Sequence, residues 1–230
     1  MQQDLRHNLN SERAKMLANA AVGLSAFFVA CCLVMHFVQP DLNPVEDAVS
    51  YYMNGRLGWI LGLGLVAMGM GSLFLAGSLY SLIGPLRARS GLSFLSLWGA
   101  GVVVGGIFPP DPRGHWNSPP SLPGMIHASV AMVAFLAFPT ASLLLSRRLA
   151  ALSRTFGTTW LLTWLAVLGT ASLGAFFVCL APVFSHHPPY ALGLIERVLL
   201  GLYVAWLLAA GVGVRRAAER TKPVGQTPIA

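Results

Sequence analysis

Long apolar runs alternate with short polar segments along the chain. Six of these runs are long enough to cross the hydrocarbon core of a bilayer, which is about 30 Å thick and requires about 20 helical residues. Because lipid offers the backbone no hydrogen-bond partners, each run is expected to be a helix. The predicted helices cover residues 16–38, 57–83, 91–108, 125–145, 158–183 and 195–214.

This pattern predicts an all-α fold, a six-transmembrane-helix bundle flanked by an N-terminal segment, residues 1–15, and a basic C-terminal tail, residues 215–230. Arg13 and Lys15 in front of an apolar run are also typical of a signal peptide. However, the run continues to Val38, and no Ala-x-Ala cleavage site follows it. A membrane span is therefore the favoured interpretation of the first run.

The composition agrees with a polytopic membrane protein and excludes several other classes. Of the 230 residues, 55% are hydrophobic and only 10% are charged, whereas an ordinary soluble domain has about 25% charged residues. Together with a mean hydropathy of +0.66, this rules out a disordered chain and a disulfide-stapled mini-protein. A net charge of +7 would suggest nucleic-acid binding in a soluble protein, but no nucleic-acid module is recognisable here. We expect no nucleic-acid partner.

The basic residues predict the orientation of the bundle. Cytoplasmic loops of membrane proteins carry an excess of Lys and Arg, and a cytoplasmic N-terminus places twelve basic residues inside and three outside. An even number of spans then puts the C-terminus in the cytoplasm as well. The outer residues are Arg56, Arg113 and Arg197; the inner residues are Arg6, Arg13, Lys15, Arg87, Arg89, Arg147, Arg148, Arg154, Arg215, Arg216, Arg220 and Lys222.

Acidic residues and histidines gather on the predicted outer face, which holds five of the eight acids and five of the six histidines. No Asp, Glu, Lys, Arg or His lies deep within a predicted span. Ion-coupled transporters usually place an ionisable group near the bilayer midplane, so this class is disfavoured. Candidate chemistry is therefore expected at the extracytoplasmic rim.

The first outer loop has polar residues at helical spacing. Glu46, Ser50 and Asn54 recur every four residues, and in a helix they would form one polar stripe. The alternative is a solvated interfacial helix anchored by neighbouring aromatic residues. On the first interpretation, Glu46 and Ser50 are candidate ligand-binding residues.

Asp111 and His127 are the candidates of the second outer loop. Asp111 follows the C-terminal end of the predicted third helix, where a carboxylate is unfavourable without a partner. That partner is Arg113, Arg197, a histidine or a metal ion; alternatively, Asp111 caps a turn. A helix N-terminus favours the neutral form of His127, which is then able to bind zinc with Asp111 or to hydrogen-bond a neighbouring helix. No spacing here is a recognised metal motif, and no other cofactor is expected.

Glu196 and Arg197 are the candidates at the start of the predicted sixth helix. Consecutive residues of a helix point about 100° apart, so these two side chains are not expected to pair with each other. Because their flanking residues are apolar, at least one should face the bundle. The alternative is an ion pair at the rim that only fixes the helix.

Glycines are concentrated in the predicted second and third helices. Gly58 and Gly62, and likewise Gly101 and Gly105, have the four-residue spacing that lets membrane helices approach closely. Packing within the chain is the favoured interpretation, and the oligomeric state does not follow from it.

Four motifs in this order resemble the bacterial membrane proteins of the domain-of-unknown-function family 998, over roughly Met16–Arg216. More distantly, the chain is similar to the eukaryotic Frag1/DRAM/Sfk1 membrane proteins. The motifs are Ser50-Tyr51-Tyr52, Gly106-Ile-Phe-Pro-Pro-Asp-Pro112, Gly124-Met-Ile-His127 and Gly193-Leu-Ile-Glu-Arg197.

The resemblance implies six helices and a location in the bacterial cytoplasmic membrane, but no activity. Tyr51 stands where the family motif leads us to expect Asp, so a function that needs this carboxylate would require Glu46 or Asp47 instead.

Three functions are compatible with these observations. The first is a non-enzymatic protein whose outer-rim site binds a lipid headgroup or small ligand, with membrane lipids as partners. The second is a metal-dependent hydrolase of a lipid amide or ester, with Asp111 and His127 as ligands. The third is a passive small-molecule transporter. The site expected in the first case comprises Glu46, Ser50, Asp111, His127, Glu196 and Arg197.

Overall fold

Each of the six apolar runs is a helix in the computed structural model of the chain, which describes residues 2–83, 85–115, 118–152 and 156–220. The long helices are α1 (Gln2–Val38), α2 (Trp59–Ile83), α3 (Pro85–Ile107), α4 (Leu122–Leu152), α5 (Phe156–Leu180) and α6 (Leu192–Arg220), and short 3-10 helices lie at η1 (Val49–Asn54) and η3 (Ala181–Ser185). The described residues contain no strand. All six helices are long and apolar enough to span a membrane. The predicted all-α, six-span architecture is confirmed, and the chain is a multi-pass membrane protein.

Four helices, α1, α3, α4 and α6, extend beyond the apolar runs that predicted them, whereas α2 begins at Trp59 rather than at residue 57 and α5 ends at Leu180 rather than at residue 183. α1 begins at Gln2 rather than at residue 16, and α6 continues through the first part of the predicted tail to Arg220. These extensions support each other, because the Ser11 hydroxyl donates to the Ala218 carbonyl at 2.7 Å and Lys15 lies 3.6 Å from Glu219. An apolar run in the sequence predicts only the part of a helix that crosses lipid. It does not predict the charged residues by which the helix continues beyond the membrane. Arg154, Lys222 and residues 221–230 lie outside the described residues.

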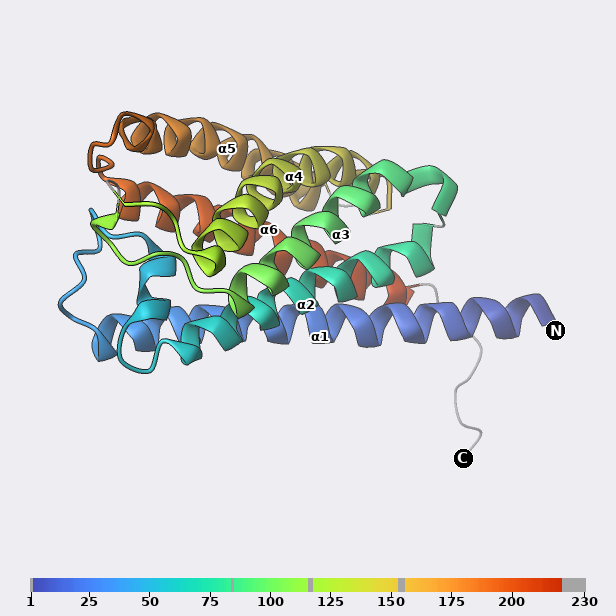
Figure 1. Cartoon of the computed structure of the whole chain (residues 1–230). Coiled ribbons are helices and arrows are strands. Elements are labelled where there is room, and N and C mark those ends of the chain that lie inside the picture. Colours follow the sequence, from blue (N-terminus) through green and yellow to red (C-terminus); the bar gives the residue numbers. More distant parts are fainter. Residues whose placement is uncertain (1, 84, 116–117, 153–155, 221–230) are drawn as a thin grey trace.

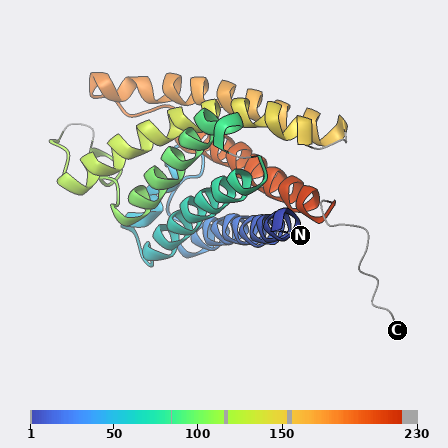
Figure 2. The ribbon, with the colours of Figure 1, turned by 90° about the vertical axis from the view of Figure 1, so that its right-hand side faces the viewer.

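The helices form a bundle in which each packs against the next and α6 closes on α1. Figure 1 shows α1 and α2 on one side of the bundle and α4 and α5 on the other, and Figure 2 shows the same arrangement turned by 90°. The start of α1 and the end of α6 lie at one end. We call the opposite end, formed by residues 39–58, 108–115, 118–121 and 181–191, the loop end.

Glycines bring the backbones of α2 and α3 into direct contact. A β-carbon at Gly69 would lie 2.6 Å from the Gly99 carbonyl oxygen, and one at Gly99 would lie 2.9 Å from the Gly69 carbonyl oxygen. Gly62 and Gly106 repeat this relation nearer the loop end, at 2.8 Å in both directions. In lipid the hydrophobic effect does not drive helices together, because the acyl chains are themselves apolar. The close approach at these glycines stabilises the α2–α3 pair through van der Waals packing instead.

Two buried tryptophans of the interior bond serine hydroxyls. Trp98 donates its indole N–H to the Ser72 hydroxyl at 3.1 Å, and Trp206 donates to the Ser146 hydroxyl at 2.9 Å. Tyr203 stacks on Phe138 with ring centroids 4.1 Å apart. Aromatic side chains therefore fill the space between α3, α4 and α6 without leaving these indole donors unpaired in an apolar environment. Because these contacts need no ionised group, the charged side chains can stay near the helix ends, where water is available.

We expect Gly106→Ala to destabilise the bundle. The added β-carbon would lie 2.8 Å from the Gly62 carbonyl oxygen and 2.9 Å from the Val66 nitrogen, so α2 and α3 would have to separate. The free energy of unfolding in detergent should fall by about 1–3 kcal/mol. Gly174→Ala is the matched control, because a β-carbon at that position would have no other atom within 4 Å. Equal unfolding midpoints for the two variants would contradict this account of the α2–α3 contact.

Candidate functional site

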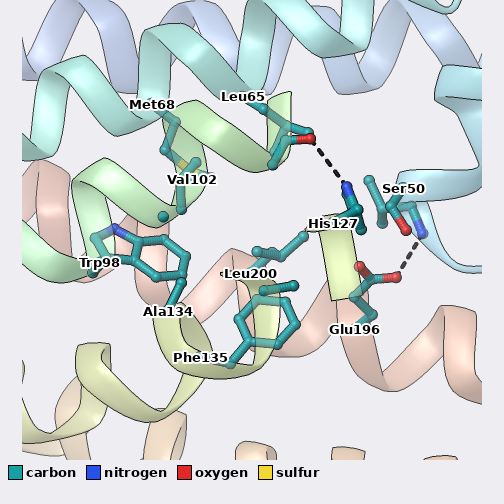
Figure 3. Close-up of a pocket in the computed structure, with 14 residues that line it drawn as sticks. Ser50, Leu65, Met68, Trp98, Val102, His127, Ala134, Phe135, Glu196 and Leu200 are labelled. Carbon is teal, nitrogen blue, oxygen red and sulfur yellow. Dashed lines mark hydrogen bonds between the residues drawn. The ribbon is translucent and has the colours of Figure 1, made fainter. Parts of the chain in front are cut away.

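Three of the predicted site residues meet at one cavity beneath the loop end. Ser50, His127 and Glu196 line a cavity of about 50 Å³ that is otherwise surrounded by mostly apolar side chains from α2, α3, α4 and α6. Figure 3 shows these three residues together at one end of the cavity, with Trp98 and Met68 at the other. The cavity thus has a polar end toward the loops and an apolar end toward the middle of the bundle.

Glu196, the fifth residue of α6, is held by the first residue of η1. Its side chain is buried, with 6% of the residue exposed, and Oε2 accepts a hydrogen bond from the Val49 backbone N–H at 2.6 Å. The loop reaches α6 because Gly193 has no side chain; a β-carbon there would overlap the Asp47 carbonyl. The Leu194 N–H adds a bond to the Val45 carbonyl at 2.9 Å.

His127 is buried against the end of α3. Its Nδ1 lies 2.8 Å from the Phe108 carbonyl oxygen and 3.0 Å from the Gly105 carbonyl oxygen. Carbonyl oxygens only accept, so Nδ1 carries a proton and donates to carbonyls that the end of a helix leaves without helical partners. Nε2 takes no part in these two bonds.

The polar stripe predicted for the first loop is wrong. η1 begins only at Val49, after a turn in which the Asp47 N–H donates to the Asn43 carbonyl at 2.8 Å. Glu46 therefore lies outside the helix, is exposed, and accepts from the Ala191 N–H at 3.2 Å. A 3-10 helix also repeats every three residues rather than four, so Ser50 and Asn54 diverge: Ser50 lines the cavity, and Asn54 is exposed.

Asp111 binds the residue that caps α4 and does not line the cavity. Its two carboxylate oxygens lie 3.2 Å from the Ser121 backbone N–H, directly before the first residue of the helix. Ser121 caps the helix, because its hydroxyl accepts the Gly124 N–H at 3.0 Å. Gly124 allows the carboxylate to approach, because a β-carbon at that position would overlap it. Asp111 therefore lies at a positive helix end, whereas the predicted alternative was a cap on a turn, and Arg113 binds Asp47 instead.

A metal centre has no ready ligand set in the described part of the chain. No group of three or more His, Cys, Asp or Glu side chains lies there in an arrangement that could hold a metal ion. Zinc binding by Asp111 and His127 stays a prediction.

Arg197 points away from Glu196, as expected from their adjacent positions on the helix. Its Nε donates to the His36 Nε2 at 3.1 Å, and Nη2 donates to the Tyr52 hydroxyl at 3.3 Å. Nη1 donates at 2.9 Å to three carbonyl oxygens, those of Pro44, Asp47 and Gly193. The guanidinium therefore ties α1, the first loop and α6 together.

Asp47 has a role that the sequence did not indicate. This carboxylate is buried. Its Oδ2 accepts hydrogen bonds from Arg113 Nη1 at 2.7 Å and from the Asn43 backbone N–H at 2.8 Å. Asp47 therefore fixes the first loop to the second. In the sequence, only the four-residue separation of Asn43 and Asp47 could have indicated that these two residues are in contact. The sequence suggested Arg113 only as a partner of Asp111.

Tyr51 occupies the position where the family motif has Asp. It is half-buried, and the loss of water, followed by the negative charges of Glu196, Asp47 and Asp111, raises the pKa of its phenol. The side chain is therefore a neutral phenol at physiological pH and does not replace a carboxylate. Of the two suggested substitutes, Asp47 is engaged with Arg113 and Glu46 is exposed.

Comparison with known proteins identifies one family. The model of the family described as "Protein of unknown function (DUF998)" matches residues 21–213. No curated protein and no solved structure matches the chain. The more distant similarity to Frag1/DRAM/Sfk1 proteins stays a prediction.

We expect Asp47→Ala to destabilise the loop end more than Arg113→Gln. The first change leaves the Asn43 N–H and a guanidinium without their acceptor, which costs about 1–3 kcal/mol. The second removes a half-exposed partner while Asp47 keeps the Asn43 N–H, and such pairs contribute at most about 1 kcal/mol. Thermal unfolding of both variants in detergent measures the difference; a larger loss for Arg113→Gln would contradict the proposed role of Asp47.

Proposed function

We propose that the chain, which belongs to the DUF998 family of proteins of unknown function, is a non-enzymatic membrane protein that binds the hydrogen-bond-donating end of a lipid headgroup or of a small soluble ligand. The binding site is the cavity formed by Ser50, His127 and Glu196. The observation that supports this proposal is the convergence of three polar side chains from η1, α4 and α6 on one cavity with mostly apolar walls.

The site offers acceptors rather than donors. Oε2 of Glu196 is occupied by Val49, which leaves Oε1 for a ligand, and the protonated Nδ1 of His127 leaves Nε2. The Ser50 hydroxyl can accept as well as donate. The nearby cation, Arg197, lines a different depression of the surface. These groups are complementary to a protonated amine or a hydroxyl.

The volume limits the size of the group that enters. One water molecule needs about 10–15 Å³ of cavity volume. A cavity of about 50 Å³ therefore accommodates about three to five non-hydrogen atoms. Ethanolamine and the terminal hydroxyls of a glycerol headgroup are of this size. A complete lipid headgroup with its phosphate is too large, and its remainder would have to lie outside.

The proposed location is the bacterial cytoplasmic membrane, with the loop end on the extracytoplasmic side. Ten basic residues of the described helices lie in the opposite half of the bundle, which suits a cytoplasmic face. They are Arg6, Arg13, Lys15, Arg87, Arg89, Arg147, Arg148, Arg215, Arg216 and Arg220. A ligand would then reach the cavity from the outer leaflet or the extracytoplasmic solution.

We expect ethanolamine to stabilise the purified protein against thermal unfolding and Glu196→Gln to weaken its binding by about tenfold or more, since hydrogen bonds to charged groups contribute about 1.5–3 kcal/mol. The amide oxygen of Gln keeps an acceptor for Val49, so the loop should remain in place. Choline is the matched control for recognition of the amine, because it keeps the hydroxyl of ethanolamine but its quaternary nitrogen has no N–H donor.

Ser142→Ala is the control variant for Glu196→Gln, since it also changes a buried polar side chain. Ser142 donates to the Pro139 carbonyl and does not line the cavity, so ethanolamine binding should be unchanged. Dioctanoyl phosphatidylethanolamine tested beside free ethanolamine distinguishes a lipid from a soluble source. The proposal fails if ethanolamine and glycerol leave the unfolding midpoint unchanged, or if His127 and Glu196 variants alter neither ligand binding nor membrane lipid content. Stoichiometric zinc together with hydrolysis of the lipid would instead support the metal-dependent hydrolase.

A further inference from the structure

A second and larger depression lies on the outside of the bundle, between α1 and α6. It has a volume of about 340 Å³. Its walls are mostly apolar side chains, and two polar residues, His36 and Arg197, lie where α1 ends and α6 begins. We infer that this groove binds a membrane phospholipid, with its phosphate at Arg197 and one acyl chain along the groove. The inference is independent of the proposed function, because it uses a different surface and different polar residues.

The groove has the length of one leaflet. On α6, the residues that line it run from Arg197 through Gly201 to Leu208. Eleven helical steps of 1.5 Å amount to about 16 Å, and half of the hydrocarbon core is about 15 Å. The lining therefore extends from the end of the span to near the middle of the bilayer, which is the course of an acyl chain.

The α1 wall is also directed toward lipid. Val29 and Leu33, one helical turn apart, are 37% and 58% exposed, and both line the groove. Gly201 on the opposite wall has no atom within 4 Å of the position of a β-carbon, so space remains open there. The groove is thus apolar and accessible from the hydrocarbon region.

Arg197 brings a positive charge to the loop end of the groove. Its hydrogen-bond partners are carbonyl oxygens, a tyrosine hydroxyl and an imidazole nitrogen, none of which carries a negative charge. In the described part of the chain, no carboxylate forms a salt bridge with it. One N–H of Nη2 remains after the bond to Tyr52.

His36 cannot supply the missing negative charge. Its Nδ1 lies 2.7 Å from the Cys32 carbonyl oxygen and is therefore the donor, and its Nε2 accepts from Arg197. A guanidinium that is half-buried beside lipid and paired only with neutral groups is complementary to a phosphate, which Arg recognises through charge-assisted hydrogen bonds.

The inner cavity is separated from this groove. Val49 and Leu200 contribute to the lining of both, so they form the partition. Glu196 and Ser50 lie on the inner side, and His36 and Arg197 on the outer side. An acyl chain in the groove therefore does not have to enter the bundle.

The test uses the full-length protein, purified in detergent and delipidated, with three probes. Dioctanoyl phosphatidylglycerol carries chains and a phosphate, dioctanoylglycerol carries the same chains without phosphate, and inorganic phosphate carries no chain. We expect only the first to raise the unfolding midpoint substantially. Gly201→Leu fills the groove one helical turn after Arg197 and keeps the guanidinium and its hydrogen-bond partners. It should raise the Kd of phosphatidylglycerol by about tenfold or more, as should Arg197→Gln.

Gly174→Leu is the control, because it adds the same side chain to α5 at a position that is equally open. Equal affinity for dioctanoylglycerol and phosphatidylglycerol would overturn phosphate recognition. Equal effects of Gly201→Leu and Gly174→Leu would overturn the groove as the binding place. Binding of inorganic phosphate that depends on Arg197 and not on Gly201 would assign the site to a soluble anion instead of a lipid. Gly201→Leu keeps the hydrogen bonds of Glu196 and Arg197 to the first loop. Ethanolamine binding measured in this variant therefore distinguishes a failure of this inference from a failure of the proposed function.

Discussion

The attachment of the first loop to the start of α6 is the constraint on which the candidate sites depend. Glu196 accepts the Val49 N–H from inside the bundle, while Arg197 donates to the Pro44 and Asp47 carbonyls from outside. A single loop is thereby held from both sides by two consecutive residues of one helix. Val49 becomes the wall between the inner cavity and the outer groove. Without this attachment, neither depression would have a closed polar end.

The sequence was sufficient for the architecture and for the separation of Glu196 from Arg197, because both follow from local rules. Six apolar runs give six spans, and adjacent helical residues point in different directions. The six-residue site was predictable only in part. Ser50, His127 and Glu196 meet, whereas Glu46 and Asp111 serve the loops. The spacing of polar residues in a loop does not reveal whether the loop forms an α-helix, a turn or a 3-10 helix. Because the first loop forms a turn followed by a 3-10 helix that begins at Val49, Glu46 does not lie on the expected stripe.

The contacts that the sequence could not supply are those across long separations. The pairing of Asp47 with Arg113 and of His36 with Arg197 depends on which loops meet at the end of the bundle, and no periodicity encodes this. Gly193 and Gly124 are informative in retrospect, because each marks a place where another chain segment lies against a helix start. A glycine in the first turn of a membrane helix, as at these two positions, is thus a signal of close loop contact, whereas its partner has to come from the structure.

The division of polarity at α6 has a chemical consequence. Acceptors gather in the inner cavity, where Glu196 meets Ser50 and His127, and the donor-rich guanidinium of Arg197 lies in the outer groove. Exchanging the two residues would place an acid beside lipid and a cation inside the bundle, where it would face His127 and lose its carbonyl partners. The order Glu then Arg at this helix start therefore suits the two environments that the residues occupy. On the two proposals, a ligand with N–H or O–H donors and a ligand with a phosphate would bind on opposite sides of the same partition.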